Sequence, residues 1–150
     1  MTAATAQDEI KLPTEAATLE LGGRLAPLLP RPGMVHLRGE LGAGKTTLAR
    51  GILRALGVAA EVVSPTFTLL ETYNSDGLMF AHIDLFQEWH EAGLAEALDA
   101  SDLCLVEWPE KAAGLGTPDI DVALRDAPAG GRVAVLAAGT AAGAACLARL

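Results

Sequence analysis

The sequence predicts an α/β fold, a three-layer sandwich in which a largely parallel sheet with one antiparallel hairpin lies between helices. Three observations support this prediction. Short apolar strands alternate with helical stretches along the 150 residues, a glycine-rich loop joins a strand to a helix, and two strand-like runs flank a turn. The chain is 51% hydrophobic and only 4% aromatic, which suits a single domain over residues 1–150 with a core of Ala, Leu and Val.

The N-terminal part of the chain is expected to hold a loose segment followed by a helix. Residues 1–10 are expected to be flexible, with Ile10 and Leu12 as a candidate edge strand. The hydroxyl of Thr14 can cap a helix. The amphipathic pattern over residues 15–26 predicts that helix, which the prolines after it bring to an end.

The glycine-rich loop lies between a predicted strand and a predicted helix. Residues 34–37 form a short apolar run that follows two prolines and a glycine, which predicts a buried strand. From Lys45 the apolar side chains follow helical spacing as far as Leu56, and Gly57 ends this helix. A strand, a loop and a helix in this order place the loop at a helix N-terminus, where anions bind well.

The rest of the chain alternates between further predicted elements. In order, these are a hairpin of strands 67–73 and 78–84 around a turn at 74–77, a helix at 87–98, a fully buried strand at 103–107, and strands at 119–124 and 132–137. The last ten residues, 141–150, fit a helix or a strand.

The pattern Gly39-x-x-x-x-Gly44-Lys45-Thr46 predicts a phosphate-binding loop. Glycines let the chain curl so that successive N–H groups point at one anion, and the helix N-terminus favours negative charge. We expect Lys45 to reach the β and γ oxygens of a nucleoside triphosphate and Thr46 to supply a Mg²⁺ ligand. The cofactors expected from this motif are ATP and Mg²⁺, and its nucleotide-binding residues are Glu40, Leu41, Gly42, Ala43, Gly44, Lys45, Thr46 and Thr47.

Two other interpretations of this loop are open. One is a glycine-rich turn with an exposed lysine, which would bind nothing. The other is a dinucleotide-binding loop, which fits less well because Lys45, Thr46 and Thr47 follow Gly44 where a third glycine is required.

Two acids at strand ends are candidates for completing a magnesium shell. Glu107 and Asp84 each follow an apolar run, and an unpaired carboxylate in such a position is costly unless a cation compensates it. The alternatives are a solvated acid at a strand exit for Glu107 and a helix N-cap for Asp84. His82 and Asp84 alternate onto one strand face, which suits either a proton relay toward water or a core histidine.

The segment from Ser64 through Pro65 to Thr66 is a rigid loop that carries hydroxyl groups. Nucleotide-dependent switches place such a segment where it senses the γ-phosphate. An ordinary turn is the alternative.

Charge and composition exclude several classes of protein. The net charge of −8 argues against a surface that grips nucleic acid directly, because phosphate contacts need clustered Lys and Arg. The start of the chain lacks a basic region followed by an apolar stretch, and no apolar run approaches the ~18 residues of a membrane helix, which favours a cytoplasmic protein. Cys104 and Cys146 lack metal-ligand spacing and are expected to be buried thiols.

The motifs taken together resemble one family of bacterial proteins. GELGAGKTT at 39–47, SPTF at 64–67, HIDLF at 82–86 and LVEWPE at 105–110 follow in the order found in the TsaE proteins, also called YjeE. That resemblance extends over about residues 12–124. TsaE proteins are small P-loop ATPases required for making threonylcarbamoyladenosine in tRNAs that read codons beginning with A.

The resemblance implies a P-loop NTPase-like fold and a set of nucleotide and metal contacts. It implies that Lys45 and Thr46 bind the nucleotide and Mg²⁺ and that Glu107 contributes to the metal shell. Trp108 is expected to line the nucleotide pocket or a surface that faces a partner, with a plain packing role as the alternative.

The resemblance also implies catalytic roles. Asp84 is a candidate for orienting or activating water, Lys45 for neutralising the phosphates, and Thr66 belongs to a switch-like segment. The chain departs from the family after Asp84, because Phe86 and Gln87 stand where most members have tyrosine and arginine. This departure leaves open what charge or partner contact those two positions provide.

A TsaE-like protein is expected to be a helper and not the modifying enzyme. ATP would be bound and hydrolysed on a complex with TsaD and TsaB, which handle the threonylcarbamoyl group and the tRNA, so contact with tRNA is indirect. Weak hydrolysis by the isolated chain is expected, because no arginine near the γ-phosphate is evident in the sequence.

Three other functions start from the same loop. A small-molecule kinase is the main alternative, but residues 111–117 make a poor lid because they carry one basic residue. A GTP-driven switch fits less well, since no Asn/Thr-Lys-x-Asp guanine motif occurs. A scaffold that binds nucleotide without turnover would keep Lys45 and Thr46 but not need Asp84.

Overall fold

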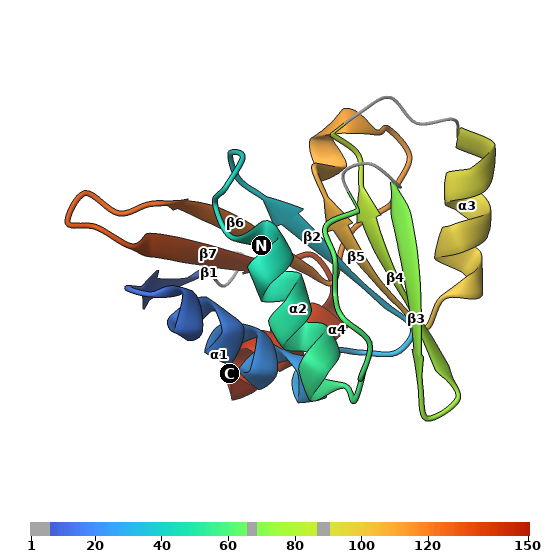
Figure 1. Cartoon of the computed structure of the whole chain (residues 1–150), viewed down its shortest axis with the longest axis horizontal. Helices are drawn as coiled ribbons and strands as arrows, with labels where there is room; N and C mark the ends of the chain where they lie inside the picture. The colour runs from blue at the N-terminus through green and yellow to red at the C-terminus, as the bar shows by residue number, and fades with distance from the viewer. Residues whose placement is uncertain (1–6, 66–68, 87–90) are drawn as a thin grey trace.

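The computed structural model describes residues 7–65, 69–86 and 91–150, and these form one sheet with helices on both faces (Figure 1). The strands are β1 Gln7–Leu12, β2 Gly33–Arg38, β3 Leu70–Ser75, β4 Leu78–Asp84, β5 Leu103–Glu107, β6 Ile120–Asp126 and β7 Arg132–Ala138. The helices are α1 Glu15–Leu25, α2 Lys45–Ala55, α3 Glu91–Ala100 and α4 Ala141–Arg149, with short 3-10 turns at Ala26–Leu28 and Pro109–Lys111.

The sheet is parallel at its centre and antiparallel at both sides. Its strand order is β1-β7-β6-β2-β5-β4-β3, and the pairs β6–β2, β2–β5 and β5–β4 are parallel. The β3–β4 hairpin forms one side, as the alternating pattern predicts, and β7 and β1 extend the other side in antiparallel fashion. The predicted α/β fold is confirmed, with a larger antiparallel part than expected.

The two faces of the sheet carry different helices. Successive side chains of β5 point to opposite faces of the sheet. Leu103 and Leu105 pack in one core cluster with α1, α2 and α4, whereas Cys104 and Val106 pack in a second cluster with α3. Figure 1 shows α1 and α2 side by side in front of the sheet and α3 next to the β3–β4 side. The three predicted layers are therefore unequal.

Helices α1 and α2 approach closely where two glycines face the partner helix. A Cβ added to Gly22 of α1 would lie 2.7 Å from the backbone oxygen of Leu48, and one added to Gly51 of α2 would lie 2.5 Å from that of Leu19. Both distances are shorter than any contact that a side chain tolerates. This contact holds α2, and the loop at its N-terminus, against α1.

Replacing Gly22 with alanine is expected to destabilise the protein by about 1–3 kcal/mol, since the methyl group would push the two helix backbones apart. Gly23 provides a matched control in the same helix, because a Cβ there meets nothing within 4 Å. Gly23→Ala is expected to stabilise the fold by about 0.5–1 kcal/mol through helix propensity. Urea unfolding measures both, and equal effects of the two changes would contradict the packing described.

Several element boundaries differ from the sequence prediction. The chain before Lys11 is not loose over residues 7–10, because β1 begins at Gln7 and pairs with β7. The hairpin turn is shorter than predicted: β3 continues to Ser75, and the turn consists of Asp76 and Gly77, both with positive φ. The described part of α3 runs from Glu91 to Ala100, two residues beyond the predicted end.

The C-terminal segment, which fits a helix or a strand by sequence, forms helix α4. The hydroxyl of Thr140 caps this helix by accepting a hydrogen bond from Gly143 N at 3.0 Å. The hydroxyl of Thr14 caps α1 in the same way, as predicted, by accepting a hydrogen bond from Ala17 N at 3.1 Å.

The cysteines are buried free thiols, as predicted. Burial raises the pKa of the Cys104 thiol to about 11, so it is not a reactive thiolate at neutral pH. Among the helices of the described residues, none combines the length and the apolar character needed to cross a bilayer.

Candidate functional site

The loop between β2 and α2 adopts the curled conformation that the glycine motif predicts. Gly39 has a φ of 149°, and Gly44, the residue that caps α2, has a φ of 106°. A Cβ on Gly39 would also lie 2.7 Å from the backbone oxygen of Leu124. Because L-residues rarely adopt positive φ, glycine is required at both positions.

Lys45 lies inside the loop and not on its surface. Its Nζ donates hydrogen bonds to the backbone oxygens of Gly39 at 2.6 Å and Glu40 at 2.9 Å, and its side chain is only 4% exposed. Burial lowers the pKa of Lys45, and the nearby carboxylates of Glu107 and Asp84 oppose that shift. The alternative of an exposed lysine on a plain turn is therefore wrong.

Thr46 and Glu107 meet at the carboxyl end of β5. The Thr46 hydroxyl donates to Glu107 Oε2 at 2.9 Å, and His82 Nε2 lies 2.6 Å from the same oxygen. Glu107 is 3% exposed, so the alternative of a solvated acid at a strand exit is wrong. His82 and Glu107 lie on the neighbouring strands β4 and β5, and Thr46 reaches them from the first turn of α2.

The Thr46–Glu107 pair fits Mg²⁺. The hydroxyl gives its hydrogen to the carboxylate and keeps oxygen lone pairs for a cation, and both residues offer the hard oxygen ligands that Mg²⁺ prefers. In the described part of the chain, no group of three or more His, Cys, Asp or Glu could hold a metal ion unaided. A metal here would need oxygens from another source, and Mg²⁺ commonly takes them from nucleotide phosphates.

Asp84 lies on β4, the strand next to the one that carries Glu107, and the two acids line one cavity. Its Oδ1 accepts a hydrogen bond from the backbone N–H of Phe86 at 2.8 Å, which closes a local turn. His82 contacts Glu107 and has no exposed surface, which fits the alternative of a core histidine with a hydrogen bond and not a relay toward water.

Trp108 follows Glu107 in a left-handed conformation, with φ 58° and ψ 48°. This conformation costs a non-glycine residue free energy, and such strain is typical of functional sites. The centre of the indole ring lies 4.5 Å from Lys45 Nζ. The centres of the indole ring and the Phe86 ring are 5.0 Å apart. Trp108 thus lines the cavity beside the lysine, and it also packs against the core cluster of the α3 face, as the packing alternative expects.

One cavity of about 220 Å³ brings most of the predicted residues together. Its lining consists of Leu41, Gly42, Gly44, Lys45, Thr46, Thr47, Ser64, Asp84, Glu107 and Trp108. Glu40 and Ala43 are absent from this lining and instead line a neighbouring hollow of the same loop. The predicted catalytic residue Thr66 lies outside the described residues, although Ser64 of the same segment reaches the cavity.

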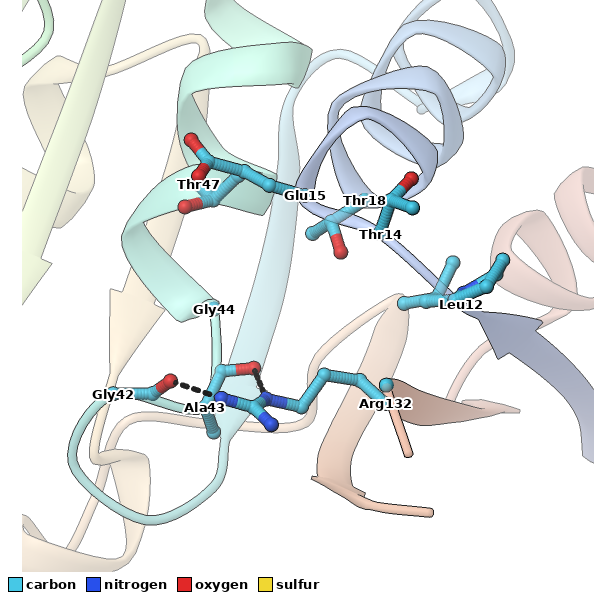
Figure 2. A pocket seen from close by; sticks show the side chains of 11 residues that line it. Leu12, Thr14, Glu15, Thr18, Gly42, Ala43, Gly44, Thr47 and Arg132 are labelled. Atoms are coloured by element: carbon cyan, nitrogen blue, oxygen red, sulfur yellow. Dashed lines mark hydrogen bonds between the residues drawn. The ribbon is translucent and has the colours of Figure 1, made fainter. Parts of the chain in front are cut away.

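A second cavity, of about 280 Å³, lies beside the same loop and was not predicted from the sequence. Figure 2 shows Arg132 reaching from β7 to the loop, where it donates to the backbone oxygens of Gly42 at 2.9 Å and Ala43 at 3.2 Å. Thr14 and Thr18 of the α1 region form another part of the wall. No local signal marks Arg132, because it is an isolated basic residue 90 positions from Gly42.

Comparisons with known proteins show which family this chain resembles. Residues 12–134 match the family model described as threonylcarbamoyl adenosine biosynthesis protein TsaE. The TsaE protein of Haemophilus influenzae is 39% identical over 121 residues, which cover 74% of this chain and 76% of that protein. The TsaE protein of Synechocystis is 36% identical over 116 residues, or 69% and 71% of the two chains.

A solved structure supports the fold. The crystal structure of YdiB from Bacillus subtilis superposes with a TM-score of 0.82 and covers 99% of this chain and 97% of that one. At 24% sequence identity, this likeness concerns the arrangement of strands and helices alone.

Proposed function

The chain belongs to the TsaE family of threonylcarbamoyl adenosine biosynthesis proteins, and from this premise we propose that it binds and hydrolyses ATP with Mg²⁺. Hydrolysis would support the formation of threonylcarbamoyladenosine on tRNA. The observation that carries the proposal is the convergence of Lys45, Thr46 and Glu107 on one cavity beside a curled glycine loop. Lysine, hydroxyl and carboxylate in this arrangement suit a nucleoside triphosphate with its metal.

The triphosphate would occupy the cavity that Lys45 lines. Lys45 Nζ now satisfies two loop oxygens, so its ammonium group is already placed beside the backbone that would surround the phosphates. Thr46 and Glu107 would hold the Mg²⁺, which when bound neutralises charge on the phosphate oxygens. Asp84, in the same wall, would orient the attacking water and accept its proton.

The nucleoside would lie in the second cavity. Both cavities are lined by Gly42, Gly44 and Thr47, so a ligand that wraps around this part of the loop can occupy both. Arg132 would hold the loop in place from behind, because its guanidinium group bridges the oxygens of Gly42 and Ala43. This arrangement requires a nucleoside triphosphate only, and it does not require the loop to bind a dinucleotide.

Partners would complete the site. In the described part of the chain, Lys45 is the only cation lining the phosphate cavity, which leaves a second positive charge at the γ-phosphate to come from elsewhere. Leu41, at the tip of the loop, is 68% exposed, which suits contact with another protein. We propose that TsaD and TsaB are those partners, that contact with tRNA is indirect because the chain carries a charge of −8, and that the complex acts in the cytoplasm.

Calorimetric titration with ATP and GTP, with Mg²⁺ and with EDTA, tests the binding part of this proposal. We expect ATP to bind more tightly with Mg²⁺ than without it. Phosphate release would then be measured for the protein alone and with TsaD and TsaB, and faster release with the partners is expected. No binding at millimolar ATP would contradict the proposal, and a stoichiometric phosphorylated small molecule would indicate a kinase instead.

A further inference from the structure

His82 is a buried polar side chain that the steps proposed above do not use. It lies in β4, its side chain has 0% exposure, and its Nε2 is 2.6 Å from Oε2 of Glu107. The Thr46 hydroxyl reaches the same oxygen at 2.9 Å. His82 therefore stands directly behind the carboxylate proposed to hold the metal.

The position of His82 in the strand would suit an apolar residue. Phe80, His82 and Asp84 alternate onto the face of β4 that looks toward α2, and Phe80 belongs to the apolar core on that face. On the neighbouring strand, Leu105 precedes Glu107 on the same face. Packing alone gives no reason for an imidazole between a core phenylalanine and the site.

The hydrogen bonds of His82 show which of its nitrogens is in use. A carboxylate only accepts hydrogen bonds, so Nε2 carries the hydrogen and donates it to Glu107. Nδ1 is buried and has no hydrogen-bond partner among the described residues. An unpartnered buried nitrogen carries a desolvation cost that a leucine would avoid. The presence of histidine here is therefore explained only if its contact through Nε2 has a role of its own.

We propose that His82 is a positioning residue for metal binding: its Nε2–H fixes Oε2 of Glu107 so that the carboxylate is held ready for Mg²⁺. Both side-chain hydrogen bonds described for Glu107 end on Oε2, which leaves Oε1 outside these two bonds. Groups behind a metal ligand commonly set its orientation in this way. The inference rests on the proposed function, because it requires Glu107 to take part in Mg²⁺ binding.

The test compares His82→Leu with His82→Gln by the magnesium dependence of ATP affinity. For each protein, the ratio of the Kd in EDTA to the Kd in Mg²⁺ is measured by calorimetry. We expect this ratio to fall about 10-fold in His82→Leu, with the Kd in EDTA changed less than about 3-fold. Glutamine is expected to keep most of the ratio, because its side-chain nitrogen reaches the position of Nε2.

His36 provides the matched control. It is also a buried histidine, at 5% exposure, and its Nδ1 also has no partner in the described structure. Its Nε2, however, contacts the Met34 sulfur and no carboxylate. His36→Leu should therefore leave the magnesium ratio unchanged, whatever it does to stability.

Two further results decide the matter. A wild-type ratio in His82→Leu would show that His82 is only a core residue and overturn the inference, whereas a wild-type protein without any magnesium effect would overturn the proposed function itself. If circular dichroism shows that His82→Leu does not fold, His82→Asn replaces it, because the shorter amide cannot reach Glu107. If the magnesium ratio falls in the asparagine variant and is retained in the glutamine variant, the result supports a positioning role for His82. If the two variants have equal magnesium ratios, the result refutes that role.

Discussion

Replacing Lys45 with alanine is expected to weaken ATP binding by on the order of 100-fold, the largest effect on nucleotide affinity that any single substitution in this protein should produce. Hydrogen bonds from a charged donor to phosphate contribute about 1.5–3 kcal/mol each, and Lys45 is the cation that lines the phosphate cavity in the described structure. Calorimetry with Mg²⁺ present measures the loss directly. Binding that stays within a few-fold of the wild type would refute the phosphate site.

Two controls separate the loss of charge from other effects of this substitution. Lys45→Met keeps an aliphatic side chain and removes the ammonium group, so it should lose as much affinity as the alanine variant. Lys11→Ala changes the net charge equally at an exposed position of the edge strand and should bind ATP normally. Thermal unfolding without nucleotide reports how much Lys45 stabilises the loop through Gly39 and Glu40.

The second large effect is expected on hydrolysis. Asp84→Asn should lower the rate of phosphate release in the complex with TsaD and TsaB by about 10²–10⁴-fold, which is the usual contribution of a general base. ATP affinity should change little, since asparagine keeps a side-chain oxygen that can accept from Phe86 N. Single-turnover measurement separates the chemical step from product release.

Asp76 offers the matched control for this substitution. It lies exposed in the hairpin turn, and its φ of 51° is one that asparagine also tolerates. Asp76→Asn should therefore hydrolyse ATP as the wild type does. Undiminished hydrolysis by Asp84→Asn would assign the activation of water to another group and favour a role for Asp84 in the turn alone.

Much of the fold could be predicted because its signals are local. The run at 103–107 is fully buried and became β5 at the predicted bounds, and Thr14 caps α1 with the hydrogen bond expected from its hydroxyl. The predicted ends of strands were wrong where the backbone conformation of a turn, and not the pattern of apolar side chains, sets the end of the strand. The hairpin turn contracted to Asp76 and Gly77 because two residues with positive φ match the twist of paired strands better than the longer turn.

The site was predictable only in part. Lys45, Thr46 and Glu107 could be found because glycine spacing and an acid at a strand end are visible in the sequence. Arg132 could not, since an isolated arginine in β7 carries no sign that it will reach the loop. The partner of His82 could not be predicted either, because alternation along β4 places it on the same face as Asp84 but cannot show that it contacts Glu107 of the next strand.

The sequence by itself determined most of the elements, the curled glycine loop and the resemblance to TsaE proteins, because hydrophobic period, glycine spacing and helix capping act over a few neighbouring residues. Only the tertiary structure decided which strands are neighbours, that His82 and Thr46 share one carboxylate oxygen, and that Arg132 closes a second cavity against the loop. Those contacts join residues 25 to 90 positions apart. Their formation depends on the order of the strands in the sheet, which no local pattern specifies.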